Sequence, residues 1–211
     1  TKEKVSFDKI LERLERLSDG LNVDIFHITQ ETIKGLHNDI NTSDLDKLSA
    51  DISATNIHLH PDYNKFASRI AINNLHKQTF EKYIDVVKIQ FENNKVSKQF
   101  YEFVNENEKE LQTMLNYERD YGFDFFGFKT LERSYLFKID NKTIERPQHL
   151  FLRVAIQVHS TANDFVRIKE TYDYMSQFYF THASPTLFNS GTNHPQLSSC
   201  FLLHCEDDLS E

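Results

Sequence analysis

The chain has 211 residues, of which 39% are hydrophobic and 13% aromatic, and its formal net charge is −8 at pH 7. This length allows one large or two small globular domains, while an acidic charge spread along the chain argues against a broad nucleic-acid-binding surface. Because no stretch approaches the roughly eighteen apolar residues that a membrane span needs, and no signal peptide opens the sequence, we expect a cytoplasmic protein that enters no membrane.

The first 79 residues predict a small helical bundle capped by a strand. Val5 and Phe7 alternate with polar neighbours, as in the second strand of a hairpin, and Asp8 is placed to cap the helix that follows. Apolar stripes at helical spacing predict the rest of the bundle. Four helices are expected. The first ends at Gly20, the second spans 29–38, the third begins at Ser43 and ends before Pro61, and the fourth spans 62–77.

Apolar and aromatic residues continue at helical spacing beyond residue 79 and indicate further core helices. Two short apolar strands, 136–139 and 143–145, suit a hairpin that turns at Asp140 and Asn141. The helices expected in this part of the chain span 80–91, 97–111, 148–159 and 163–178.

Residues 181–205, THASPTLFNSGTNHPQLSSCFLLHC, combine turn-forming polar residues with an apolar run that begins at a cysteine. Pro185 and Gly191 interrupt any regular element in the polar part. The run 198–203 predicts a short buried strand, with Cys200 at its entrance beside two hydroxyl groups. A separation of five positions along a strand holds Cys200 and Cys205 roughly 16 Å apart, beyond the about 7 Å of bridged Cα atoms, so a disulfide of Cys200 needs another partner.

The stretch 181–205 resembles the first active-site strand of the large, catalytic subunit of class I ribonucleotide reductase. Other runs resemble the eukaryotic and viral type of that subunit, in the same order: KVSFDKI at 4–10, HPDYNKFASRIAINNLHKQT at 60–79, YGFDFFGFKTLERSYLFKI at 121–139 and ERPQHLFLRVAI at 145–156. The chain closes just after a strand that is unstable alone, so we expect an N-terminal piece of a longer polypeptide.

The resemblance implies a mainly α chain with small β elements and two domains. Residues 1–79 correspond to the helical ATP-cone regulatory domain, with its first strand missing, and residues 80–211 to the start of the ten-stranded α/β barrel that carries catalysis. The enzyme reduces ribonucleoside diphosphates to deoxyribonucleoside diphosphates by a thiyl-radical mechanism. Neither the thiyl cysteine nor the remaining redox cysteines of the family match positions in this chain, so we expect the piece alone to be inactive.

The resemblance also implies ligands and partners. ATP, dATP and other deoxynucleoside triphosphates, bound with magnesium, regulate the enzyme. A small subunit supplies the radical from a di-iron tyrosyl centre, thioredoxin or glutaredoxin supplies electrons, and the large subunit forms homo-oligomers. No metal ligand set is expected in this chain.

Three groups of site residues follow from the matched motifs. Cys200 is the candidate catalytic thiol, since a thiol can give up hydrogen and close to a disulfide, and Ser184 and Ser199 are candidate substrate ligands. The specificity-effector site would include Asp208, Leu209 and Ser210. The ATP or dATP site would include Glu3, Lys4, Val5, Ser6, Phe7, Asp8, Lys9, Thr42 and Asp46.

The same residues could instead have purely structural roles. By residue type alone Cys200 suits an inert buried hydrophobe, the two serines suit backbone hydrogen bonding in turns, and the segment 3–9 suits a strand with a helix cap. Of the histidines, His58, His60, His149 and His159 are expected to be surface or capping residues. A stand-alone nucleotide-sensing module and a helical protein-interaction domain are the alternative functions.

Overall fold

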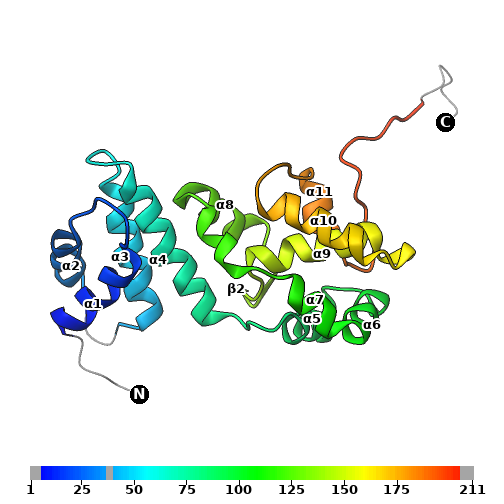
Figure 1. Cartoon of the computed structure of the whole chain (residues 1–211), viewed down its shortest axis with the longest axis horizontal. Coiled ribbons are helices and arrows are strands. Elements are labelled where there is room, and N and C mark those ends of the chain that lie inside the picture. The colour runs from blue at the N-terminus through cyan, green and yellow to red at the C-terminus, as the bar shows by residue number, and fades with distance from the viewer. Residues whose placement is uncertain (1–5, 37–39, 205–211) are drawn as a thin grey trace, which may run out of the picture.

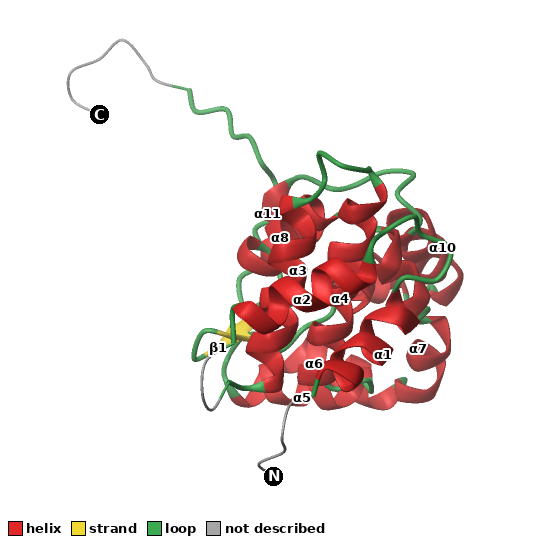
Figure 2. Cartoon of the chain, turned by 90° about the vertical axis from the view of Figure 1, so that its left-hand side faces the viewer, coloured by secondary structure: helices red, strands yellow, loops and turns green. Residues whose placement is uncertain are grey.

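The computed structural model describes residues 6–36 and 40–204, and within them the protein is built from helices with one small hairpin (Figure 2). Their bounds in chain order are α1 (Phe7–Leu17), α2 (Ile25–Lys34), α3 (Thr42–Thr55), α4 (Asp62–Gln78), α5 (Tyr83–Glu92), α6 (Lys98–Glu106), α7 (Glu108–Met114), η1 (Tyr117–Gly122), α8 (Phe125–Ser134), β1 (Lys138–Ile139), β2 (Lys142–Thr143), α9 (Pro147–His159), η2 (Ser160–Ala162), α10 (Phe165–Ser176) and α11 (Ser184–Asn189).

The first four helices form the predicted bundle, which lies on the left in Figure 1. α3 packs along α4, and α1 and α2 pack on each other and on this pair. The buried faces carry the apolar stripes seen in the sequence, with Ile10 and Leu14 from α1 meeting Ile28, Phe66 and Ile70 in one core. The helical bundle expected for the first third of the chain is therefore confirmed.

The start of the bundle differs from the expectation. Phe7 is the first residue of α1 rather than part of a strand, and its ring meets Phe26 edge-on with centroids 5.1 Å apart. Ser6, not Asp8, caps the helix, because the Ser6 hydroxyl accepts from the Lys9 amide at 3.4 Å. Asp8 lies in the first turn, where its charge favours the helix N-terminus. A short apolar residue pattern such as Val5-x-Phe7 is shared by a strand and a helix start.

Three further helix boundaries differ from the expectation, two of them at capping residues. α2 begins at Ile25, four residues before the expected start, because the Asp24 carboxylate accepts from the His27 amide. α3 ends at Thr55, and turns rather than helix lead to Pro61. The expected helix 97–111 divides at Asn107, whose side-chain amide donates to the Phe103 carbonyl at 2.8 Å.

The second half of the chain packs around α9, the most deeply buried helix. Its seven consecutive residues 150–156 are all buried, and η1, α10 and α11 lie against it. The predicted hairpin is confirmed, with Lys138 opposite Thr143. Asp140 and Asn141 turn it with φ angles of 47° and 62°, the left-handed conformation that a two-residue hairpin loop requires.

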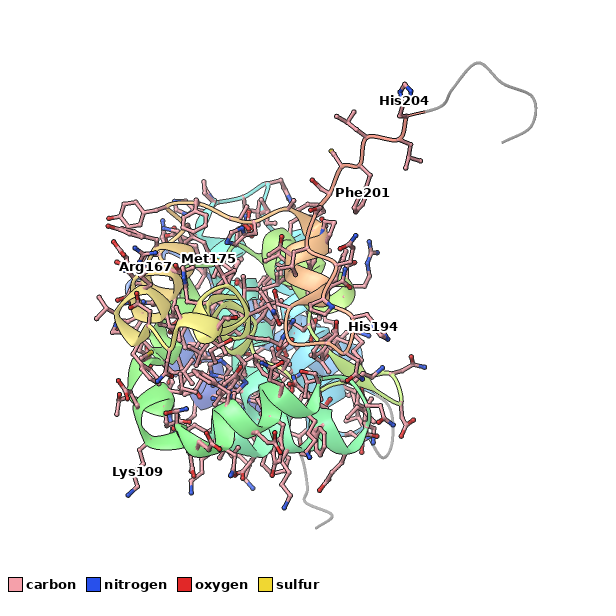
Figure 3. The ribbon with its side chains drawn as sticks, turned by 90° about the vertical axis from the view of Figure 1, so that its right-hand side faces the viewer. Lys109, Arg167, Met175, His194, Phe201 and His204 are labelled. Carbon is pink, nitrogen blue, oxygen red and sulfur yellow. The ribbon has the colours of Figure 1, made fainter. Side chains whose placement is uncertain are left out.

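The segment that follows α10 differs most from the expectation. Residues 184–189 form α11, although the sequence suggested only turns there. The predicted buried strand 198–203 lies outside the folded body, with Leu202 fully exposed (Figure 3). No strand within the described residues pairs with it, and a lone strand leaves its backbone groups unpaired. The α/β barrel is likewise not formed by the described part of the chain.

Candidate functional site

The candidate nucleotide site gathers on three helices of the bundle around one buried carboxylate. Asp46, on α3, is only 3% exposed and forms an ion pair with the Arg13 guanidinium of α1. The Lys77 ammonium, at the end of α4, lies 3.6 Å from the same carboxylate oxygen. Two cations thus share one anion, which leaves a local excess of positive charge.

Burial changes the acid–base properties of this cluster. The pKa of Lys77 is lowered to about 8, first by burial and then by the nearby charge of Arg13. Burial also lowers the pKa of the Arg13 guanidinium, which nonetheless stays protonated at neutral pH. A partly dehydrated lysine beside a second cation is a site where an anion such as a phosphate is favoured.

The other predicted nucleotide ligands within the described residues belong to two of the same helices. Thr42 opens α3 one turn before Asp46, and Ser6, Phe7, Asp8 and Lys9 form the start of α1. Glu3, Lys4 and Val5 lie outside the described residues.

Sequence reasoning missed Arg13 and Lys77. Arg13 lies one helical turn after Lys9 on α1, a spacing that places two side chains on the same face. Lys77 lies in the matched run 60–79, yet only the packing of α4 against α3 brings it to Asp46.

The candidate substrate and thiol residues lie at the opposite end of the chain. Ser184 is the first residue of α11, and its hydroxyl lies 3.0 Å from the hydroxyl of Tyr135. Ser199 and Cys200 are exposed, with 3.8 Å between the Ser199 hydroxyl and the Cys200 sulfur. Cys200 is a free, exposed thiol in this structure.

Asp208, Leu209 and Ser210 lie outside the described residues. In the described ranges 6–36 and 40–204, no three His, Cys, Asp or Glu side chains are placed to hold one metal ion. Nor does any helix of those ranges have the length and apolarity to cross a bilayer.

The histidines of the described residues serve structural roles where their contacts are visible. His149 is fully buried on α9 and accepts from the Arg146 amide in a capping box. Burial lowers the pKa of His149 to about 3, with a further contribution from the charge of Arg146. His149 was correctly expected to cap, although it is not at the surface.

Comparison with known proteins decides the family. A family model described as "Ribonucleotide reductase, all-alpha domain" matches residues 121–195. Over 99% of its length the chain is 48% identical to the ribonucleoside-diphosphate reductase large chain of Schizosaccharomyces pombe, of which it covers 27%. It is 46% identical to the large subunits of Danio rerio and Variola virus, over 99% and 100% of this chain and 28% of each relative. The chain belongs to the ribonucleotide reductase large-subunit family.

The chain thus spans little more than a quarter of the ribonucleotide reductase large subunits that it matches. The all-alpha family model lies within residues 80–211, where the resemblance had implied the start of the barrel. The helices α8 to α11 account for that description.

Proposed function

We propose that this chain is the N-terminal part of a ribonucleoside-diphosphate reductase large subunit, which reduces ribonucleoside diphosphates to deoxyribonucleoside diphosphates. The observation that carries the proposal is an identity of 46–48% to proteins of that name along nearly the whole chain. On this proposal residues 1–79 are the ATP-cone domain, and residues 80–211 lead from the all-alpha region into the catalytic barrel.

Cys200 is proposed as one of two reducing thiols. A radical on another cysteine removes the 3′ hydrogen of the ribose, and the 2′ hydroxyl leaves as water. The abstracted hydrogen returns to the 3′ carbon at the end, which restores the cysteine radical. Cys200 and a partner cysteine elsewhere in the protein together supply two electrons and two protons, and their sulfurs close to a disulfide. The free thiol of Cys200 next to the Ser199 hydroxyl supports this role.

Ser184 and Ser199 are proposed to hold the substrate. Short hydroxyl groups and neighbouring amides can donate to diphosphate and ribose oxygens without filling the space the ribose needs. Tyr135 supports Ser184 in this role, because its hydroxyl lies within hydrogen-bond distance of the serine hydroxyl.

The Asp46 cluster is proposed to bind ATP or dATP, with Arg13 and Lys77 added to the ligands expected from the sequence. The cations suit a triphosphate, and the amides at the start of α1 suit its oxygens. The effector that selects the substrate would be bound at Asp208, Leu209 and Ser210. Magnesium would accompany these nucleotides.

The partners follow from the same proposal. A small subunit with a di-iron tyrosyl radical starts the reaction, thioredoxin or glutaredoxin reduces the disulfide, and large subunits associate with one another in the cytoplasm. A stand-alone nucleotide-sensing module is the second candidate, favoured only by the Asp46 cluster, which needs no residue beyond α4.

The test uses the full-length protein with its radical subunit and a dithiol reductant. Cys200→Ser is expected to abolish deoxynucleotide formation, because serine cannot form the disulfide, while ATP binding stays unchanged. Cys205→Ser is the matched control and should remain active. Turnover that survives Cys200→Ser would contradict the proposed role of Cys200. Intact ATP binding without any deoxynucleotide formation by the unchanged protein would favour the sensing module.

A further inference from the structure

Arg153 on α9 forms a buried ion pair with Glu145 and also donates hydrogen bonds to two backbone carbonyls. Its Nε and Nη2 atoms donate to the two carboxylate oxygens of Glu145 at 2.7 and 3.1 Å. Its Nη1 atom donates to the backbone carbonyls of Leu187 and Ser190 at 3.2 and 2.7 Å. Both side chains of the pair are fully inaccessible to solvent.

A buried ion pair adds little net stability, because removing two charges from water costs about as much as their attraction returns. Its geometric effect is larger, since the planar guanidinium has donors in fixed directions. The centroid of the Phe137 ring lies 4.0 Å from the guanidinium carbon, so the ring closes one face of the group. Arg153 therefore fixes the position of the carbonyls that it binds.

Those carbonyls belong to the end of α11. A helix of six residues is not stable alone, so its position depends on contacts with the rest of the protein. The turn after α11 is anchored too, because the Gly191 amide donates to Gln157 and its carbonyl accepts from the Ser97 amide. Gly191 has a φ of 79°, and an added Cβ would lie 3.3 Å from the Arg153 side chain.

α11 in turn connects the two parts of the candidate substrate site. Ser184 is its first residue. From the same helix, the Thr186 hydroxyl donates to the Leu197 carbonyl at 3.0 Å, and the Asn189 amide donates to the Gln196 carbonyl at 2.7 Å. The segment so held runs directly into Ser199 and Cys200.

We propose that Glu145 and Arg153 are positioning residues for substrate binding, which act by holding α11 so that Ser184 and the segment leading to Cys200 keep their relative placement. This inference rests on the function proposed above for Ser184. Neither residue touches the substrate in this proposal, and both act through backbone carbonyls of α11.

The test is a double-mutant cycle in the full-length enzyme, with Arg153→Lys and Ser184→Ala alone and together. Lysine keeps the charge but cannot bind Glu145 and both carbonyls at once. We expect Arg153→Lys to raise the KM for the nucleoside diphosphate about tenfold, with a smaller change in kcat and unchanged ATP binding. Arg167→Lys, at an exposed position of α10, is the matched control and should leave KM unchanged.

The double variant separates positioning from general loss of structure. If Arg153 acts through Ser184, Arg153→Lys should add little to the KM of the Ser184→Ala protein. The proposal would be overturned if the fold-increase in KM of the double variant equalled the product of the two single-variant increases. An unchanged KM in Arg153→Lys alone would also overturn it. An unchanged KM in Ser184→Ala would remove the substrate role of Ser184 itself, and the positioning role with it.

If Arg153→Lys does not fold, Asn189→Ala tests the same path with the buried pair intact. This change removes only the hydrogen bond to the Gln196 carbonyl, so the expected result is a higher KM with an unchanged melting temperature. An unchanged KM would then overturn the proposal.

Discussion

At the residue scale, the charge state of Lys77 near neutral pH depends on its burial and on the charge of Arg13. Its pKa of about 8 reflects burial and the charge of Arg13, and the Asp46 carboxylate that it approaches is already paired. A side chain with such a pKa is charged at pH 7 and largely neutral at pH 9.

On the proposed function, this pKa predicts that ATP binding to the Asp46 cluster weakens as the pH rises through about 8. The reason is that Lys77 then loses the positive charge that attracts the triphosphate. Calorimetric titration of ATP between pH 7 and 9 measures the effect. Lys77→Met should weaken binding at pH 7 and remove the decline, whereas Lys109→Met on the distant surface of α7 should change neither. An equal decline in the Lys77→Met protein would contradict the assignment.

At the element scale, a buried polar network joins α4 to the helices of the second half. The Asp120 carboxylate of η1 lies 2.7 Å from the His76 ring of α4 and accepts from Gln148 of α9 at 2.9 Å. Gln148 in turn accepts from the Tyr172 hydroxyl of α10 at 2.7 Å. Desolvation by burial raises the pKa of Asp120, while the hydrogen bond from His76 opposes that shift.

Asp120→Ala is expected to lower the free energy of unfolding by about 1–3 kcal/mol, the cost of leaving buried polar partners unsatisfied. His76 and Gln148 each lose a partner in that variant. Urea unfolding at pH 7 measures the difference, with Asp85→Ala on the exposed side of α5 as the control. A change no larger than that of the control would show that water replaces the carboxylate.

The elements also show why some predictions were correct and others were not. The hairpin at Asp140 and Asn141 was correct because turn chemistry is local and those residue types accept the left-handed conformation. α11 was missed because Ser184, Pro185 and Thr186 are typical of loops, while Pro185 is also compatible with a first helical turn. Contacts of α11 with the rest of the protein, such as those with Arg153 and Tyr135, stabilise the helical alternative.

At the scale of the whole molecule, the segment 198–204 extends away from a helical body (Figures 1 and 3). Phe201, Leu202 and Leu203 are 62%, 102% and 89% exposed, although their sequence is typical of a buried strand. On the proposed function, the remaining strands of the barrel cover them in the full-length protein.

Limited proteolysis tests this view of the segment. Chymotrypsin is expected to cleave this chain first after Phe201 or Leu202, because an unpaired extended segment fits a protease while packed helices do not. Mass spectrometry of the products locates the cut. In the full-length protein the same bonds should be protected, and equally fast cleavage there would contradict burial of the strand.

Local information in the sequence was sufficient for the helical bundle, the hairpin and the type of the long helices, because apolar spacing and turn chemistry act over a few residues. The matched motifs also pointed to the family. Tertiary packing alone brought Arg13 and Lys77 to Asp46 and the buried Arg153 to the end of α11. Those contacts join residues far apart in the chain, so no local pattern encodes them. The strand 198–203 shows the same dependence, because a strand is stable only where another strand accepts its hydrogen bonds.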